Sequence, residues 1–409
     1  MNLTQGRPAR QILLFALPLV VGSLFQQLYS FVDTVMVGRY ALAAVGPTYS
    51  LHFLIQGFVQ GTCVGFGIPL AKAVGARDKG EFQRYFWNGV WLCLILGLVL
   101  TSVTAALAVP LLRLIATPAE ILPQAACYIR IIFLGIPATI LYNFCAGVLR
   151  ASGDSRRPTY FLLLSSLLNI GLDYMLLIPI PLGVAGAALA TVLSQLVSGL
   201  LNLFWILRKT HLLQDPVPQK APSAAHLATL SRVGLPMGFE YSLSAIGAVI
   251  LQGAVNGLGT AAIAGQTAGE KNRQLFTLPM ESVGMAMATY AGQNDGAKAY
   301  GRIRSGIRGG LCIRYLSCIS TLFCLHGSLM ILRNTLQGMG YSLHAVLSGV
   351  FELLGRGLGS WLALGYWGFF GICFANPLAW CFALCYCTTL VCHFLRQREN
   401  NRQVSGKNT

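Results

Sequence analysis

Long apolar runs separated by short polar gaps are the dominant pattern in this sequence. Each run approaches or exceeds the roughly 20 residues that an α-helix needs to cross the hydrocarbon core of a bilayer. Eleven such runs lie at residues 12–37, 49–71, 88–110, 124–148, 159–180, 185–207, 233–256, 269–291, 309–332, 342–365 and 368–395. The pattern therefore predicts an all-α, polytopic membrane protein with about eleven transmembrane helices.

The composition and the placement of charge agree with membrane insertion. Hydrophobic residues make up 55% of the chain and charged residues only 10%, yet the net charge is +16. Lys and Arg concentrate in alternate gaps, and the gaps between these, such as 111–123 and 257–268, are almost free of them. By the positive-inside rule this predicts a multi-pass protein of the cell (inner or plasma) membrane with a cytoplasmic N-terminus. The basic charge then reflects topology, and we expect no nucleic-acid partner.

Cysteine and histidine give no sign of a metal site or of catalysis. The 12 cysteines lie mostly inside the apolar runs, and the 6 histidines form neither a zinc-ligand spacing nor an HExxH pair. We therefore expect no enzyme, no catalytic residue and no cofactor. The first apolar run is too long for the core of a cleavable signal peptide, so it is expected to remain as an uncleaved anchor.

A long polar stretch divides the chain into two parts. Residues 208–232 combine prolines with charge and lack apolar periodicity, which predicts a cytoplasmic linker. The expected organisation is an N-terminal lobe at 1–207, the linker, a C-terminal lobe at 233–395, and a basic polar tail at 396–409.

The two lobes carry related motifs in the same order. The pairs are ALP (16–18) with GLP (234–236), AVGARDKGE (73–81) with YAGQNDGAK (290–298), LRASGDS (149–155) with LQGMGYS (336–342), and GVAGAALA (183–190) with GFFGICFA (368–375). The second pair aligns Gly75 with Gly292. An even number of spans in each half predicts a parallel repeat about an axis along the membrane normal, as in transporters that alternate access between two bundles.

The second half lacks about 30 residues between Gly292 and Gly340, judged from the spacing of these motifs in the first half. The remaining stretch is too short for two crossings of about 20 residues and a turn. We therefore predict one helix at 309–332, giving six transmembrane helices in the first lobe and about five in the second. A single crossing would send the basic tail to the outer face, against the positive-inside rule, unless the segment is re-entrant.

Ionisable residues inside the apolar runs are the candidate functional groups. Asp33 lies within the first run, where a carboxylate costs on the order of 2.5 to 3.5 kcal/mol, so it needs a partner, a proton or a cation. In the fifth run, Asn169 and Asp173 are four residues apart and share a helix face.

Several of these motifs together resemble the multidrug and toxic compound extrusion (MATE) family. They are FVDTVMVG in the first run, ARDKGE, LRASGDSRRPTY, GVAGAALAT, ATYAGQNDGA and LRNTLQGMGYS. The resemblance implies a V-shaped pair of six-helix lobes that exports small organic, often cationic, compounds across the lipid bilayer in exchange for Na⁺ or H⁺. We expect the protein to be a monomer.

The resemblance also implies a set of site residues. A cation or proton site would comprise Tyr29, Asp33, Asn169, Asp173 and Thr191, whose oxygen atoms suit a small hard cation. Pro18 would act as a hinge in the first helix. In the alternative interpretation, Asp33 and Asp173 only fix the packing of helices.

The second lobe departs from the family pattern. Ser244 stands where better-known sodium-coupled relatives carry a glutamate, and Glu240 lies one turn earlier. Glu352 and Arg356, four residues apart, are predicted to pair structurally. We expect a substrate cavity lined by Gln26, Glu240, Met280, Glu281 and Tyr290.

Two further functional hypotheses stay open at this point. The first is a flippase for lipid-linked or polysaccharide-linked cargo, which would require a strongly basic cavity for a pyrophosphate head group. The second is a protein that inserts into the membrane but does not transport, as the product of the internal deletion.

Overall fold

The computed structural model describes residues 1–45, 48–115, 117, 119–209, 211–213, 222–256, 260–317, 323–362 and 368–405. Some helical side chains in these ranges, including those of 30–45, 260–276 and 310–317, lie outside the description. Every regular element in the described ranges is a helix. The predicted all-α class is therefore confirmed.

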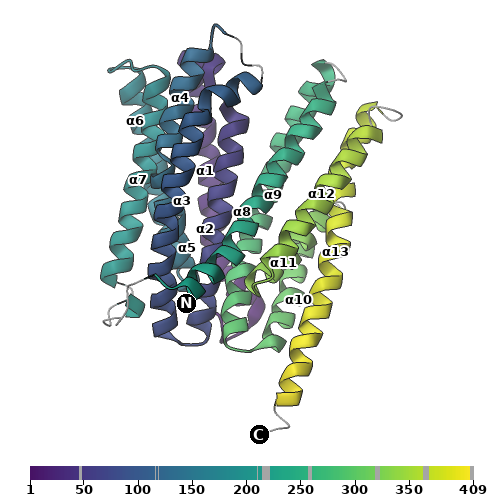
Figure 1. The fold of residues 1–409 in the computed structure, drawn as a ribbon. Helices are drawn as coiled ribbons and strands as arrows, with labels where there is room; N and C mark the ends of the chain where they lie inside the picture. The colour runs from purple at the N-terminus through teal and green to yellow at the C-terminus, as the bar shows by residue number, and fades with distance from the viewer. Residues whose placement is uncertain are drawn as a thin grey trace.

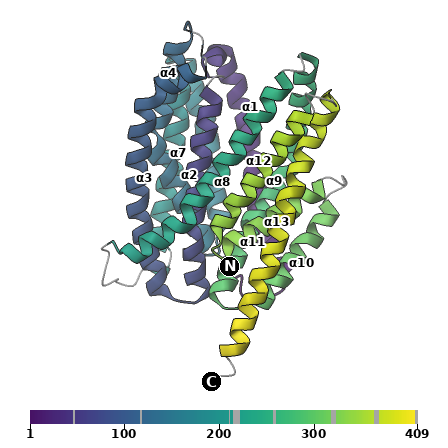
Figure 2. The same ribbon diagram turned by 45° about the vertical axis from the view of Figure 1, so that its right-hand side comes forward.

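The helices form two bundles that lie side by side and draw apart toward the end away from the two termini (Figures 1 and 2). The first bundle contains α1 (Pro8–Val45), α2 (Tyr49–Gly75), α3 (Lys79–Leu114), α4 (Leu122–Leu134), α5 (Ile136–Ala151), α6 (Arg156–Leu177) and α7 (Val184–Lys209), followed by the 3₁₀ turn η2 (His211–Leu213). The second contains α8 (Ala224–Asn256), α9 (Thr260–Gly296), α10 (Tyr300–Ser317), α11 (Phe323–Gly338), α12 (Ser342–Leu362) and α13 (Gly368–Ser405).

The described helices include six that are long and apolar enough to cross a membrane, and a seventh span if α4 and α5 are taken together. These two helices bend by 42° at Gly135. Pro137 lies in the first turn of α5, where a residue without a backbone N–H is tolerated and the preceding helix cannot continue unbroken. Large apolar side chains such as Leu98 and Leu167 are about 70% exposed, as expected for a surface that faces lipid.

The helix ends correct two of the predicted boundaries. Residues 224–232, predicted as linker, are the first turns of α8. The Ser223 backbone N–H donates to Asn88 Oδ1 at 2.8 Å and its carbonyl accepts from Leu227 N at 2.9 Å, which fixes the start of this helix. At the other end, residues 396–405 of the predicted tail continue α13.

Turns at matching positions show that the two bundles repeat one another. Gly153 and Gly340 have φ of 86° and 89°, and each follows a helix in the turn that the alignment of LRASGDS with LQGMGYS predicted. Arg77 and Lys298 likewise share φ near +55° and the same pattern of turn hydrogen bonds. This second match places Gly75 opposite Gly296 instead of Gly292, so the predicted alignment there was wrong by one helical turn.

The prediction of a single helix at 309–332 is wrong. Two helices, α10 and α11, occupy this part of the chain, with lengths of 18 and 16 residues, or about 27 and 24 Å at 1.5 Å per residue. At the start of α10, Arg302 donates to the carbonyl of Gly6 at 3.0 Å. Just after α11, the Met339 carbonyl accepts from Lys72 Nζ at 2.7 Å, and Lys72 also pairs with Asp295.

These contacts place the start of α10 and the end of α11 at the same end of the molecule as the N-terminus. The shorter spacing of the motifs in the second half is therefore accommodated by two short antiparallel helices and not by the loss of one. Because the direction of the chain is preserved, α13 returns to the N-terminal end, and both termini lie toward that end in Figure 1. The conflict between span length and the positive-inside rule thus disappears.

Glycines allow the two bundles to pack closely through α2 and α8. A Cβ on Gly65 would lie 2.5 Å from Gly234 Cα, one on Gly61 would lie 2.5 Å from Met237 O, and one on Gly238 would lie 2.8 Å from Phe58 O. Each helix thus presents a G-xxx-G pair, the pattern that lets helix backbones approach in membranes. Helix α1 also connects the bundles, because its buried residues Ile12 and Phe15 join the core of the second bundle.

Candidate functional site

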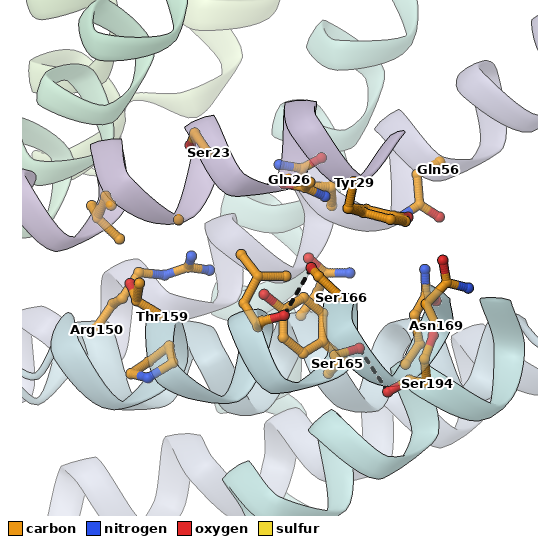
Figure 3. A pocket seen from close by; sticks show the side chains of 18 of the residues that line it. Ser23, Gln26, Tyr29, Gln56, Arg150, Thr159, Ser165, Ser166, Asn169 and Ser194 are labelled. Carbon is orange, nitrogen blue, oxygen red and sulfur yellow. Dashed lines mark hydrogen bonds between the residues drawn. The ribbon is translucent and has the colours of Figure 1, made fainter. Parts of the chain in front are cut away.

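A polar cavity lies inside the first bundle, between α1, α2, α5, α6 and α7, with one contribution from α9 (Figure 3). Its empty volume is about 930 Å³, including its open side. Amide and hydroxyl side chains dominate the wall, and a few aliphatic residues complete it. The lining residues are Leu19, Gly22, Ser23, Gln26, Tyr29, Gln56, Gln60, Tyr142, Asn143, Arg150, Pro158, Thr159, Leu162, Ser165, Ser166, Asn169, Ser194, Gln195 and Met285.

Helix α6 supplies one wall because its polar residues recur at helical spacing. Thr159, Ser166 and Asn169 follow one another by seven and three residues, so they share a face of the helix. Ser165 Oγ donates to the Ser194 carbonyl at 2.8 Å, which ties α6 to α7 beside the cavity (Figure 3). The wall extends over ten residues, or about 15 Å.

Three of the predicted cation-site residues come together at one end of this wall. In the orientation that satisfies its partners, the Asn169 amide donates to Asp173 Oδ2 at 3.3 Å and accepts from the Thr191 backbone N–H at 3.3 Å. The Asp173 side chain is fully buried. The Thr191 hydroxyl donates to Ala187 O at 3.1 Å, which leaves the lone pairs of that oxygen as acceptors.

The two remaining members of the predicted set belong to α1. Tyr29 lines the cavity (Figure 3). Asp33 is a residue of α1, but its side chain lies outside the described part of the structure.

The predicted hinge, Pro18, lies inside α1 and packs directly on α6. The Thr159 hydroxyl approaches the Pro18 carbonyl at 3.2 Å. One turn later, a Cβ on Gly22 would lie 3.2 Å from Thr159 Cγ2, so the two helices touch closely here. Because proline has no N–H, the helix lacks one backbone hydrogen bond in the turn before Pro18.

The predicted substrate residues separate into two groups. Gln26 lines the cavity, whereas Glu240, Met280, Glu281 and Tyr290 are not among its described lining residues. Tyr290 is completely buried in the core of the second bundle and its hydroxyl donates to Arg302 O at 2.9 Å. Met280 is buried and Glu281 is exposed. In place of these residues, Met285 is the contribution of α9 to the cavity.

Glu240 belongs instead to a buried ion-pair network in the second bundle. Arg333 on α11 donates to Glu240 Oε1 at 2.9 Å and to Glu352 Oε2 at 2.8 Å. Gln337 donates to the second Glu240 oxygen at 2.6 Å, and Arg356 pairs with Glu352 as predicted. Both carboxylates are about 4% exposed, as is Arg333, and the four charges sum to zero.

Sequence reasoning missed two arginines, Arg333 and Arg150. The sequence places Arg333 within or near a span, as part of LRNTLQGMGYS, but nothing local indicated that α8 and α12 would both direct a glutamate at it. Arg150 is part of LRASGDS, in one of the gaps where Lys and Arg concentrate, which predicted a cation of a cytoplasmic loop, yet it lines the cavity. The sequence signal for this placement was weak. Arg150 lies one residue before the end of α5, and the next helix, α6, carries a polar face.

Two helical bundles related by a repeat, with helices long and apolar enough to cross a membrane and a polar cavity inside the first bundle, are typical of a multi-pass membrane transporter. The sequence matches the family model MatE over residues 18–175 and 236–335, together more than half of the chain. The protein therefore belongs to the MatE family. Members of this family are transporters, which confirms the expectations of a membrane protein and of no enzyme.

Individual relatives support the same assignment. The chain is 30% identical to "Probable multidrug resistance protein YpnP" of Bacillus subtilis, over 72% of this chain and 67% of the relative. It is 29% identical to "Probable multidrug resistance protein YoeA" of the same organism, over 75% and 69%. Among solved structures, an "outward-facing conformation of a multidrug resistance MATE family transporter" superposes with a TM-score of 0.88 at 22% identity, covering 97% of this chain and 98% of that one. This last similarity shows the shared fold.

Proposed function

We propose that this protein is a secondary active antiporter that exports small organic compounds across the cell membrane in exchange for Na⁺ or H⁺. The observation that carries the proposal is the contact of Asn169 with Asp173 beside the cavity. Asp173 is a fully buried carboxylate, and such a group requires a cation, a proton or strong hydrogen bonds. The multidrug resistance names of the relatives support export as the direction.

Asn169 provides the physical link between ion and substrate. Its side chain contacts Asp173 on one side and lines the cavity on the other. A Na⁺ ion held by the oxygens of Asp173, Asn169 and Thr191, or a proton on Asp173, changes which groups the Asn169 amide bonds. The cavity wall therefore differs between the loaded and unloaded states, which is the differential interaction that coupling requires.

Helix α1 is the element proposed to respond. Asp33 lies 15 residues after Pro18 on this helix, and Pro18 is held against Thr159 of α6. Neutralising Asp33 and Asp173 removes one negative charge from α1 and one from α6, and α1 is then proposed to bend at Pro18. This motion would narrow a cavity that α1 lines with Gln26 and Tyr29.

The buried carboxylates described in the second bundle are already paired with cations, which supports an ion site in the first bundle. Arg333 and Arg356 neutralise Glu240 and Glu352, and Lys72 pairs with Asp295. An additional Na⁺ or proton there would meet a network whose charges are balanced, so it would gain little. We therefore assign ion coupling to the first bundle.

The orientation of the protein in the membrane follows from the positive-inside rule. The basic end that carries both termini is proposed to be cytoplasmic, and the bundles are joined at that end by the Lys72–Asp295 pair. The structure then represents the state that is closed to the cytoplasm. A flippase for pyrophosphate-linked cargo needs a strongly basic cavity. The described lining residues include one basic side chain, Arg150, which favours the antiporter over the flippase.

Transport by purified protein in liposomes tests the proposal. Export of carboxyfluorescein or rhodamine 123 should follow an imposed Na⁺ or pH gradient, and Asp173→Asn should reduce the initial rate at least tenfold. Asp154→Asn is the matched control, because Asp154 pairs with Arg157 outside the cavity. Absence of gradient-driven movement of either dye would contradict antiport and favour the transport-inactive alternative, whereas equal rates for wild type and Asp173→Asn would exclude Asp173 from coupling.

A further inference from the structure

The cavity carries an arginine that the coupling mechanism does not use. Arg150 is the only formally charged side chain among the described residues that line the cavity. The remaining lining residues carry amides, hydroxyls, phenols, aliphatic groups and one thioether, or are glycine. Within the described part of the wall, Arg150 therefore supplies the one charged group that a bound molecule can contact directly, while Asp173 lies behind Asn169 at the other end.

Arg150 forms no hydrogen bond and no ion pair with any residue that the structure describes. Its neighbours on the surface behave differently, since Arg157 pairs with Asp154 and Arg84 pairs with Glu81. A guanidinium removed from bulk water without a partner carries a desolvation cost that an anion would offset. The arginine is thus a free donor with a planar fork suited to carboxylate, sulfate or phosphate groups.

The place of Arg150 at the end of α5 does not explain why its side chain points into the cavity. It lies in the last turn of α5, where a cation interacts favourably with the helix dipole. That interaction would be satisfied equally by a side chain extended into solvent at the helix end. Figure 3 instead shows the guanidinium pointing into the cavity, beside Thr159 and on the opposite end from Asn169.

We propose that the exported compound is an organic anion whose acidic group binds Arg150 and whose body forms hydrogen bonds along α6. This inference rests on the proposed transport function and specifies its substrate class. The polar wall from Thr159 to Asn169 is about 15 Å long, so a molecule of two or three rings can reach from the arginine toward the ion site. The described lining contains Tyr29 and Tyr142 as its aromatic residues and no carboxylate, which disfavours the hydrophobic cations expected from the family resemblance.

Equilibrium binding to the full-length protein in detergent tests this assignment without requiring transport. Carboxyfluorescein and rhodamine 123 share a xanthene ring system but carry opposite charge, so they form a matched pair of probes. We expect a Kd for carboxyfluorescein at least tenfold lower than that for rhodamine 123. Arg150→Gln should raise the Kd for carboxyfluorescein at least tenfold and leave the Kd for rhodamine 123 unchanged or lower.

Two further variants separate charge recognition from a structural effect. Arg150→Lys keeps the charge and should bind carboxyfluorescein within about threefold of wild type. Arg156→Gln removes an exposed arginine six residues along the chain and should change neither Kd. Equal Kd values for wild type and Arg150→Gln, parallel losses for both dyes, or a preference of the wild type for rhodamine 123 would each overturn the inference.

The outcome also distinguishes this inference from the proposed antiport. If the wild type binds carboxyfluorescein through Arg150 but no gradient moves it across a liposome membrane, antiport fails and the anion site stands. If a gradient drives export of rhodamine 123 while carboxyfluorescein is not bound, antiport stands and the anion site is wrong.

Discussion

Lys72 and Asp295 form an ion pair of 2.9 Å that joins the last turn of α2 in one bundle to the last turn of α9 in the other. The lysine is 31% exposed and the aspartate 5%. Lys72 also donates to the carbonyl of Met339, so one side chain holds three segments together. The backbones are equally close here, since a Cβ on Gly75 would meet Gln293 O and one on Gly296 would meet Lys72 O.

We predict that this pair stabilises the closed cytoplasmic end measurably. Lys72→Gln and Asp295→Asn should each lower the melting temperature in detergent. The loss of unfolding free energy in the double variant should be smaller than the sum of the two single losses by a coupling energy of about 1 kcal/mol. The more exposed pair Arg84–Glu81 provides the control, where Arg84→Gln should change stability by less than about 0.5 kcal/mol. Strict additivity of the two single losses would show that the pair contributes nothing.

Adding a single methyl group at the contact between α2 and α8 should destabilise the protein. In Gly65→Ala the new Cβ would lie 2.5 Å from Gly234 Cα, a backbone atom that cannot move aside. We expect the bundles to separate locally and the free energy of unfolding to fall by about 1 to 3 kcal/mol, the usual cost of overpacking.

Gly171→Ala on α6 is the control for that substitution, because nothing lies within 4 Å of its added Cβ. It should be neutral or stabilise the helix by up to about 1 kcal/mol. Thermal unfolding followed by circular dichroism measures both variants. A Gly65→Ala protein as stable as Gly171→Ala would contradict the close packing.

Removing the shared arginine of the second bundle should be severely destabilising. Arg333→Met leaves Glu240 with only Gln337 and deprives Glu352 of one of its two cations, and breaking such a buried pair typically costs about 3 to 5 kcal/mol. The double variant Arg333→Met, Glu240→Gln removes one charge of each sign and leaves the Glu352–Arg356 pair in place, so it should recover a large part of that loss. Melting temperatures of the two proteins decide the matter, and a double variant less stable than the single one would argue against charge imbalance as the cause.

The α10–α11 hairpin makes a topological prediction. In a cysteine-free background, single cysteines replacing Gln5 and Ser405 should react with an impermeant reagent only after lysis, since both lie at the basic end. A cysteine replacing Leu182, in the connection between α6 and α7, should react in intact cells. Labelling of Ser405→Cys in intact cells would restore the single-crossing model.

The local features of this protein followed from its sequence. Outside 309–332, the apolar runs predicted the helical segments, because every backbone polar group within the bilayer must be bonded inside its own helix. The spacing of Asn169 and Asp173 placed them on one face of α6, because that depends only on the helical period. The turn at LQGMGYS repeated the turn at LRASGDS down to the positive φ of Gly340, because both motifs place a glycine where that conformation is needed.

Contacts between distant segments were decided by tertiary structure alone. Glu240 was predicted to line the cavity, but Arg333, 93 residues away, binds it in the second bundle. The deletion was predicted to remove one crossing, yet α10 and α11 both persist at reduced length because their ends are anchored at Gly6 and Lys72. Arg150 had the sequence environment of a loop cation, and only the packing of α5 against α6 directs it into the cavity. The period and length of a segment are encoded locally, whereas the partner of a buried charge depends on which helices the whole chain brings together.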